Sequence, residues 1–307
     1  MGKILSKYHI IGDVHGYASF LKKLLKKLGY EKNESDKYYH PKGFKVIFVG
    51  DYIDRGKEEE STIEIVKKVV ESECGIALMG NHEYNAICYA TPTAQGYLRQ
   101  HTEKNTYQHQ AFLDEYPFGS KKYKEAIEWF KTLPIYFEDK GIRVIHAAWS
   151  TKDIEKVQPF LNENNTIKDT LLLEVEKEGE VYKSMETLLK GVEYELPNGM
   201  VWKDKDGIKR NTMRFNWFKK VDKVTYKNCA LSIPKYVDLP DVEICGGVEP
   251  YNEKEVVFFG HYWMTGEPAP QTEKTACVDY SVAKKGILVA YEWSGESILK
   301  KENFIFP

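Results

Sequence analysis

Cysteine is scarce in this chain and is poorly placed for cross-linking. Only five cysteines occur among the 307 residues, and no two of them stand in a Cys-x-x-Cys pair. This odd and widely spaced set excludes a disulfide framework and offers no thiolate zinc site. We therefore expect reduced thiols and a cytoplasmic protein.

Two further features are missing. No apolar run approaches the roughly 20 residues that a membrane-spanning helix needs. Neither sign of charge dominates, because 44 lysines and arginines stand against 46 aspartates and glutamates, for a net charge of −2. This balance argues against both a membrane and a nucleic acid as partner. The oligomeric state cannot be derived from these features.

The composition is that of an ordinary globular protein, with 42% hydrophobic and 29% charged residues. The length is sufficient for one large α/β domain with a well-buried core. Short apolar segments in the first third of the chain each end in a polar motif, and amphipathic helices are predicted between them over residues 17–28 and 61–70. These segments are residues 8–11 before Gly12-Asp13-Val14-His15-Gly16, residues 45–49 before Gly50-Asp51-Tyr52-Ile53-Asp54-Arg55-Gly56, and residues 75–79 before Gly80-Asn81-His82-Glu83.

Strand, motif, helix and strand in this order indicate βαβ units with a parallel sheet. Later strands over residues 142–145 and 256–259 are followed by His146 and His261. Ligands bind beyond the carboxyl ends of such strands, so we expect these motifs to meet at one sheet edge. The charged span 151–235 has turn signals at residues 196–199 and 205–207, and we expect it to have little β structure and to cover the sheet edge.

Carboxylates, imidazoles and one amide therefore gather at the strand ends. This donor set contains no thiolate and suits Mn²⁺, Fe or Zn²⁺. The number of donors fits two metals about 3.5–4 Å apart that share one carboxylate. The candidate ligands are Asp13, His15, Asp51, Asn81, His146 and His261.

Taken in order, these motifs resemble those of the PPP-type metallophosphatases of the calcineurin-like phosphoesterase superfamily. The motifs bracket residues 9–262, and residues 277–280 look like the late structural Asp turn of that family. The chain departs from the eukaryotic pattern at Ala148, where a glycine is expected, and in lacking Leu-Arg-Gly-type stretches after Asn-His-Glu. It is more similar to bacterial members, often labelled protein phosphatases or diadenosine tetraphosphatases, which leaves the substrate open.

The resemblance implies a role for each matched residue. His82 looks like the general acid that protonates the leaving oxygen, Asp54 holds its imidazole, and Arg55 clamps the phosphate. A metal-bound hydroxide would attack phosphorus in line, without a covalent enzyme intermediate. One metal would be held by Asp13, His15 and Asp51, and the other by Asp51, Asn81, His146 and His261, so that Asp51 bridges and Asn81 also faces the phosphate.

Several further residues are candidates for secondary roles. The family usually supplies a second arginine; Arg214 and Arg210 are the candidates, and we favour Arg214 because aromatic residues follow it. His101 and His109 are interpreted as local hydrogen-bonding residues of a cap, with a substrate-facing role as the alternative. Glu83 is predicted to be a structural acceptor. Arg99 and Lys104 would meet further phosphates if the substrate is a nucleotide, and the aromatics Tyr52, Trp149 and Tyr262 are expected to wall the pocket.

The sequence thus predicts a single α/β domain over residues 1–307. Its architecture would be a two-sheet, four-layer metallophosphoesterase sandwich with helical or irregular cap insertions around residues 84–130 and 151–235. We expect a phosphoester hydrolase with two divalent metals, Mn first. The preferred substrate is a phosphorylated serine or threonine in a protein, and the alternatives are a dinucleoside polyphosphate or a nucleic-acid end. A catalytically inactive binding module is the non-enzyme alternative.

Overall fold

The computed structural model describes most of the chain. The turn expected at residues 205–207 and Cys245 lie outside the described residues, whereas Cys74, Cys88, Cys229 and Cys277 are buried free thiols. The described residues are 6–203, 209–219, 221, 223–231, 233–234, 236–244 and 250–307.

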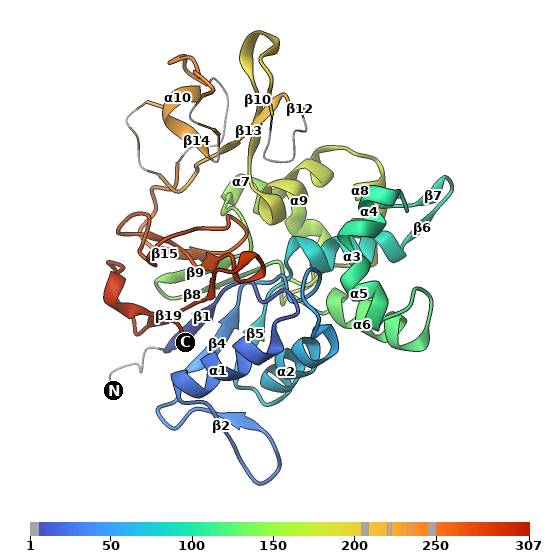
Figure 1. The fold of residues 1–307 in the computed structure, drawn as a ribbon, viewed down its shortest axis with the longest axis vertical. Coiled ribbons are helices and arrows are strands. Elements are labelled where there is room, and N and C mark those ends of the chain that lie inside the picture. Colours follow the sequence, from blue (N-terminus) through green and yellow to red (C-terminus); the bar gives the residue numbers. More distant parts are fainter. Residues whose placement is uncertain are drawn as a thin grey trace.

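The first sheet has five strands and carries the N-terminal motifs (Figure 1). Its three central strands are parallel in the order β1, β4 and β5, and the two C-terminal strands add to the β1 edge in antiparallel orientation. In spatial order the strands are β20 (Phe304–Ile305), β19 (Ala290–Trp293), β1 (Tyr8–Ile11), β4 (Lys45–Phe48) and β5 (Gly75–Ala77).

The second sheet has four strands and carries the later motifs. Strand β15 is parallel to both of its neighbours, and the edge strand β8 is antiparallel to β9. In spatial order the strands are β16 (Thr275–Cys277), β15 (Val256–Phe259), β9 (Ile142–Ile145) and β8 (Tyr136–Asp139).

The two sheets pack face to face. Ile10 and Ile47 of the first sheet share one fully buried cluster with Val144 and Phe258 of the second. Side chains alternate along a strand, so the neighbouring residues face the outer layers. On the outer side of the second sheet, Phe259 packs at 4.8 Å from the ring of Trp217. The predicted two-sheet sandwich is confirmed.

Two amphipathic helices cover the outer face of the first sheet: α1 (Ala18–Leu28) and α2 (Glu59–Glu71). The leucines of α1 are buried beneath exposed lysines, as the sequence predicted. Helix α1 ends at Gly29, whose φ of 89° is a left-handed cap conformation that glycine adopts without strain.

The expected cap insertion around residues 84–130 consists of four helices and a short hairpin. Helix α3 follows the Gly80 motif directly, and the others fold beside it, on the right of Figure 1. The elements are α3 (Asn81–Ala90), β6 (Pro92–Thr93), β7 (Gly96–Tyr97), α4 (Glu103–Gln108), α5 (Gln110–Glu115) and α6 (Lys121–Lys131).

The span 151–235 contains more β structure than expected. Helices come first, and a three-stranded antiparallel sheet in the order β10, β13 and β14 follows, at the top of Figure 1. Its strands have only two to four residues, so their alternation is weak in the sequence. The elements are α7 (Thr151–Val157), α8 (Asp169–Glu176), α9 (Glu180–Lys190), β10 (Glu193–Glu195), β11 (Trp202–Lys203), β12 (Lys209–Arg210), β13 (Thr212–Phe215), α10 (Tyr226–Cys229) and β14 (Ala230–Leu231).

Among the described helices, none combines the length and the apolar character that crossing a membrane requires. The remaining elements are short strands and turns. They are β2 (Glu31–Lys32), β3 (Tyr38–Tyr39), β17 (Asp279–Tyr280), β18 (Ile287–Leu288) and the 3-10 turns Gln158–Phe160, Pro197–Gly199, Val282–Lys284 and Lys301–Asn303.

Candidate metal centre and its cavity

The predicted ligands meet at one edge of the sandwich. Two groups of buried side chains there place their ligand atoms within 4.8 Å of one another, and Asp51 belongs to both. Each comes from a loop that follows a strand or opens a helix, as the parallel topology requires. The groups are His15, Asp51 and His82, and Asp51, His146 and His261.

Asp51 lies between the two groups, with one carboxylate oxygen toward each. Its Oδ2 is 3.6 Å from Nε2 of His15, and its Oδ1 is 3.4 Å from Nε2 of His146. Asn81 completes the second group, because its Oδ1 lies 3.0 Å from Nε2 of His146 and 2.8 Å from Nδ1 of His261. The Asp51 carboxylate is therefore common to both groups of side chains.

Asp13 reaches the same edge but contacts the main chain. Its Oδ2 accepts the backbone N–H of His261 at 3.1 Å. A Cβ atom at Gly260 would lie 2.1 Å from Oδ1 of Asp13, so only glycine fits there. The structure thus brings Asp13 beside the second group, although it does not count among the clustered ligand atoms.

The side chains fit a pair of divalent cations. The Nδ1 atoms of His15 and His146 lie 2.9 Å from the carbonyl oxygens of Ile53 and Val49, which directs the Nε2 lone pairs toward Asp51. Nε2 of His15 and Nε2 of His261 are buried and have no hydrogen-bond partner. Buried polar atoms rarely stay unpaired, so these orphaned nitrogens indicate a missing ligand.

The protonation states also suit metal binding. Burial lowers the pKa of His15 to about 3, which leaves this imidazole neutral. Burial, and then the Arg214 guanidinium, lower the pKa of His261. Burial raises the pKa of Asp51, but the neighbouring imidazoles, His146 first, lower it to a net value below the usual range. Neutral imidazoles and an ionised carboxylate are the forms that bind metal.

Backbone strain is concentrated at this edge. L-residues pay roughly 1–2 kcal/mol for a left-handed backbone conformation, and such residues cluster at functional sites. Of the thirteen non-glycine residues with positive φ in the described part of the chain, six belong to this site. They are His15, Asp51, Asp54, Arg55, His261 and Trp263.

Two buried carboxylates hold the strained loop. Glu83 accepts the backbone N–H groups of Tyr52 and Ile53 through Oε1, at 2.8 and 3.3 Å. Its Oε2 accepts those of Asp51 and Gly80, both at 2.9 Å. The predicted structural role of Glu83 agrees with this geometry. Glu59, at the start of α2, accepts the N–H of Asp54 at 2.9 Å.

His82 and Asp54 form the predicted carboxylate–imidazole pair. Nδ1 of His82 lies 2.5 Å from Oδ2 of Asp54, and both side chains are buried. Burial lowers the pKa of His82, but Asp51 and then Asp54 raise it to a net value above its usual range. Such a pair can keep a proton available for a leaving group.

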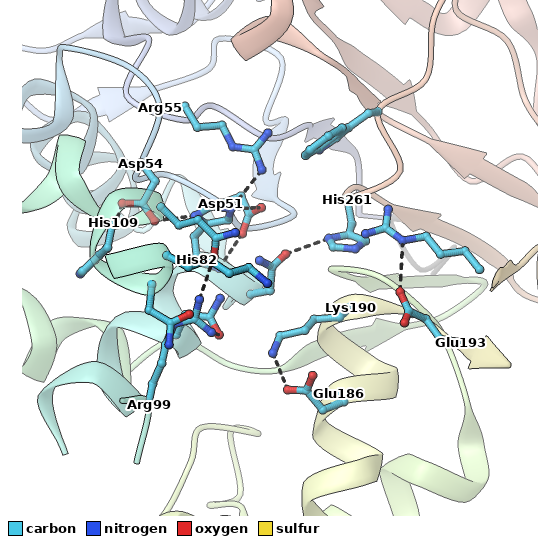
Figure 2. Close-up of a pocket in the computed structure, with 18 of the residues that line it drawn as sticks. Asp51, Asp54, Arg55, His82, Arg99, His109, Glu186, Lys190, Glu193 and His261 are labelled. Atoms are coloured by element: carbon cyan, nitrogen blue, oxygen red, sulfur yellow. Dashed lines mark hydrogen bonds and ion pairs between the residues drawn. The ribbon is translucent and has the colours of Figure 1, made fainter. Parts of the chain in front are cut away.

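His109, which we expected to be a local hydrogen-bonding residue of the cap, contacts Asp54 of the central loop. Nδ1 of His109 lies 2.9 Å from Oδ1 of Asp54 (Figure 2). Burial raises the pKa of Asp54, but His109 and then His82 lower it below the usual range. No motif surrounds His109, so the sequence contained no signal for this contact.

Arg55 lies at the mouth of the site. Its guanidinium lies 4.3 Å from the ring centre of Trp263, and Nη2 is 3.3 Å from Nε2 of His82. Trp263 is in turn fixed by Asp279, which accepts its backbone N–H at 2.7 Å. Asp279, in the segment 277–280 that resembles the late Asp turn of the family, therefore supports the tryptophan on which the arginine packs.

The expectation that three aromatics wall the pocket is wrong. Tyr52, Trp149 and Tyr262 are buried and do not line the cavity. The hydroxyl of Tyr262, for example, accepts the indole N–H of Trp217 in the outer layer. Trp263, which the sequence analysis did not single out, lines the cavity instead.

The ligand cluster opens into a cavity of about 1190 Å³. Residues of both expected insertions line this cavity. His101 does not line it, because its ring stacks on Tyr89 in the cap with the ring centres 3.7 Å apart. The described cavity lining from the insertions includes only two carboxylates, Glu186 and Glu193. The cationic side chains are Arg99, Lys104, Lys183, Lys190, Arg210 and Arg214.

These cations differ in how they are compensated. Lys190 pairs with Glu186 at 2.5 Å, and Arg214 lies 3.7 Å from Glu193. Arg99 instead donates to two neutral amide oxygens, those of Asn85 and Gln108, at 3.3 and 3.0 Å. Both predicted arginine candidates, Arg210 and Arg214, line the cavity.

Comparison with curated proteins finds relatives of one kind. Over 76 residues, 25% of this chain, it is 49% identical to bis(5'-nucleosyl)-tetraphosphatase PrpE (asymmetrical) of Geobacillus sp. (strain WCH70) and covers 31% of that protein. Over 142 residues, 46% of this chain, it is 34% identical to the protein of the same name from Oceanobacillus iheyensis and covers 55% of it. The chain thus spans between a third and about half of the length of these relatives.

Among solved structures, a protein serine/threonine phosphatase from Saccharomyces cerevisiae with similarity to human phosphatase PP5 has a similar fold. The match covers 99% of this chain and 80% of that one, with a TM-score of 0.53 and 13% sequence identity. Residues 6–262 match the calcineurin-like phosphoesterase family. This range contains every predicted ligand and the His82–Asp54 pair. The family and fold predictions are confirmed, and the chain belongs to the calcineurin-like phosphoesterases.

Proposed function

We propose that this chain is a phosphoester hydrolase that works with two divalent metals, Mn²⁺ first and Fe or Zn²⁺ as alternatives. When bound, such cations act as Lewis acids on the phosphoryl oxygens and provide a nucleophile at neutral pH. The shared position of Asp51 between two groups of donors supports this proposal. One cation would be held by Asp13, His15 and Asp51, and the other by Asp51, Asn81, His146 and His261.

The chain's own residues would then bind the phosphate and move one proton. Arg55 lies over Trp263 at the cavity mouth, where its guanidinium can hold a phosphoryl group bidentately. Arg214 is the second phosphate ligand we favour, because it lines the same cavity as Arg55 and His261. Asn81 also faces the phosphate. His82 gives its Nε2 proton to the leaving oxygen, and Asp54 holds the opposite nitrogen.

For the substrate, we propose a dinucleoside polyphosphate. The observation that supports this choice is the part of the cavity lining that comes from the two insertions. Among its described side chains, six are cationic and two are carboxylates. A single phosphoryl group needs only the metal centre and Arg55. A polyphosphate has further anionic groups, and these need additional cationic side chains. The names of the curated relatives agree with this choice. The phosphoprotein substrate preferred in the sequence analysis stays a prediction, as does a nucleic-acid end.

The test compares three substrates with Mn²⁺ present: an aryl monophosphate, a phosphothreonine peptide and diadenosine tetraphosphate. We expect the highest kcat/KM for the tetraphosphate. Lys104→Ala should raise KM for that substrate without affecting the aryl monophosphate, because Lys104 lines the cavity and does not belong to either group of ligands. Lys124→Ala is the matched control, since Lys124 is an exposed lysine of the same insertion and is not part of the cavity lining.

Each outcome of this comparison has a defined meaning. A preference for the phosphopeptide would restore the protein-phosphatase prediction. If the two lysine variants had equal effects, the cationic side chains that line the cavity would have no role in binding the polyphosphate. Absence of both Mn²⁺ binding and turnover would indicate a catalytically inactive binding module.

We further propose that the chain forms one domain, with the spans 84–130 and 151–235 as insertions into it. The support is that residues of both spans line one cavity with the ligands of the sandwich. The cytoplasm is the location we propose. The four described cysteines are buried free thiols, which a reducing compartment preserves.

A further inference from the structure

Asp54 holds an imidazole on each of its two carboxylate oxygens. Oδ2 lies 2.5 Å from Nδ1 of His82, and Oδ1 lies 2.9 Å from Nδ1 of His109 (Figure 2). All three residues are buried, so water cannot easily replace either contact. A buried carboxylate oxygen without a donor is costly, and His109 supplies the donor that Oδ1 would otherwise lack.

His109 is rigidly held between the helices α4 and α5 of the cap. Its ring stacks on Phe112 at 4.9 Å and packs against Tyr89 at 5.4 Å. Nε2 of His109 is buried and has no hydrogen-bond partner, so Asp54 is the polar group that this ring contacts. The orientation of the imidazole is therefore set by packing.

The far end of α5 is anchored to the segment that follows Asp54. Glu115, the last residue of α5, accepts the backbone N–H groups of Glu59 and Glu60 at 3.0 and 2.9 Å. Glu59 in turn accepts the N–H of Asp54 at 2.9 Å. Helix α5 is thus attached to the Asp54 loop at both ends, through His109 and through Glu115.

From this geometry we propose that His109 is a positioning residue for the general acid, an inference that depends on the proposed function of His82. A carboxylate fixed through only one oxygen can rotate about its Cβ–Cγ bond. With Oδ1 held by His109, the carboxylate plane is set and Oδ2 faces His82. The cap insertion thereby orients a proton donor that the core motifs supply, in the way that outer hydrogen bonds orient catalytic groups in designed sites.

The test uses His109→Ala, His109→Asn and His101→Ala. Asparagine keeps an N–H donor near the position of Nδ1, whereas alanine removes it. His101 is the matched control, because it is another stacked histidine of the same cap, bonds to the carbonyl oxygen of Tyr89 and does not contact Asp54. For each protein kcat and KM are measured with Mn²⁺ on an alkyl phosphate and on 4-nitrophenyl phosphate, whose leaving group needs little protonation.

We expect His109→Ala to lower kcat for the alkyl phosphate about tenfold or more, a part of the 10²–10⁴-fold that general acid catalysis supplies. KM and the rate on the aryl phosphate should change much less, and His109→Asn should recover most of the loss. Equal loss on both substrates, or no recovery by asparagine, would overturn the positioning role and leave His109 as a residue that only docks the cap.

A second measurement does not depend on turnover. The short contact of His82 with Asp54 should give a far-downfield imidazole N–H resonance in the proton NMR spectrum, assigned by its absence in His82→Ala. We expect this resonance to move upfield in His109→Ala and to stay in His101→Ala. An unchanged resonance in His109→Ala would refute the positioning role even in an inactive protein. Lack of turnover with a shifted resonance would instead refute the proposed function alone.

Discussion

The carboxylate of Glu83 holds the central loop of the site, and its removal should be measurable as a loss of stability. Four backbone N–H groups point at its two oxygens, two at each. In Glu83→Gln one oxygen becomes an NH₂ group, which cannot accept, so two buried donors lose their partner. Leaving a buried donor without its partner costs about 1–3 kcal/mol, so with two such donors the free energy of unfolding should fall by about 2–6 kcal/mol.

A loss of this size is large against the 5–15 kcal/mol that stabilises a typical protein. The assay is urea unfolding of the metal-free protein, followed by circular dichroism, with wild type and variant compared at one pH. Glu71→Gln is the control, because Glu71 is an exposed glutamate at the end of α2 and should change stability little. A loss below about 1 kcal/mol in Glu83→Gln would refute the argument that this carboxylate holds the loop.

Three further predictions concern metal content, proton transfer and pH. Asp51→Asn should lower metal occupancy at both positions together, measured by mass spectrometry of the dialysed protein; retention of one metal per chain would contradict a bridging carboxylate. His82→Ala should keep both metals and lose most turnover of alkyl phosphates but less of aryl phosphates, and equal losses would exclude it as general acid. Burial raises the pKa of Glu59 to about 9, with Asp54 adding to the effect. A carboxyl group whose pKa is higher in the folded than in the unfolded state binds more protons when folded, so its contribution to stability is full below about pH 4.5 and falls as pH rises toward 9, by up to about 1.4 kcal/mol per pH unit. Glu59→Gln should flatten this slope in urea titrations, and an unchanged slope would assign it to other groups.

The sequence was most informative for functional residues that lie just after a strand. Asp51 and His146 each come a few residues after a buried apolar segment, so local pattern and parallel topology together predicted that they would meet. The contact between His109 and Asp54 joins residues 55 positions apart through the fold of the cap. No local pattern specifies such a pairing.

Two other expectations were wrong for physical reasons that the structure makes visible. Tyr262 is adjacent to His261 in sequence, but the backbone of His261 and of Trp263 is left-handed, and within this turn Tyr262 faces Trp217 in the outer layer. Trp263, two positions after His261, returns to the cavity. The small sheet of β10, β13 and β14 was missed because strands of two to four residues give little alternation.

The strained loop that carries Asp51, Asp54 and Arg55 has a consequence for protein engineering. Its left-handed residues are kept in place by acceptors that lie outside it, Glu59 and Glu83. Residues 50–56 alone would therefore relax on another scaffold and lose the direction of all three side chains. A transplanted catalytic loop of this type must include both glutamates, one at the start of the following helix and one in the next motif, and the smallest transferable unit is the βαβ segment over residues 45–83.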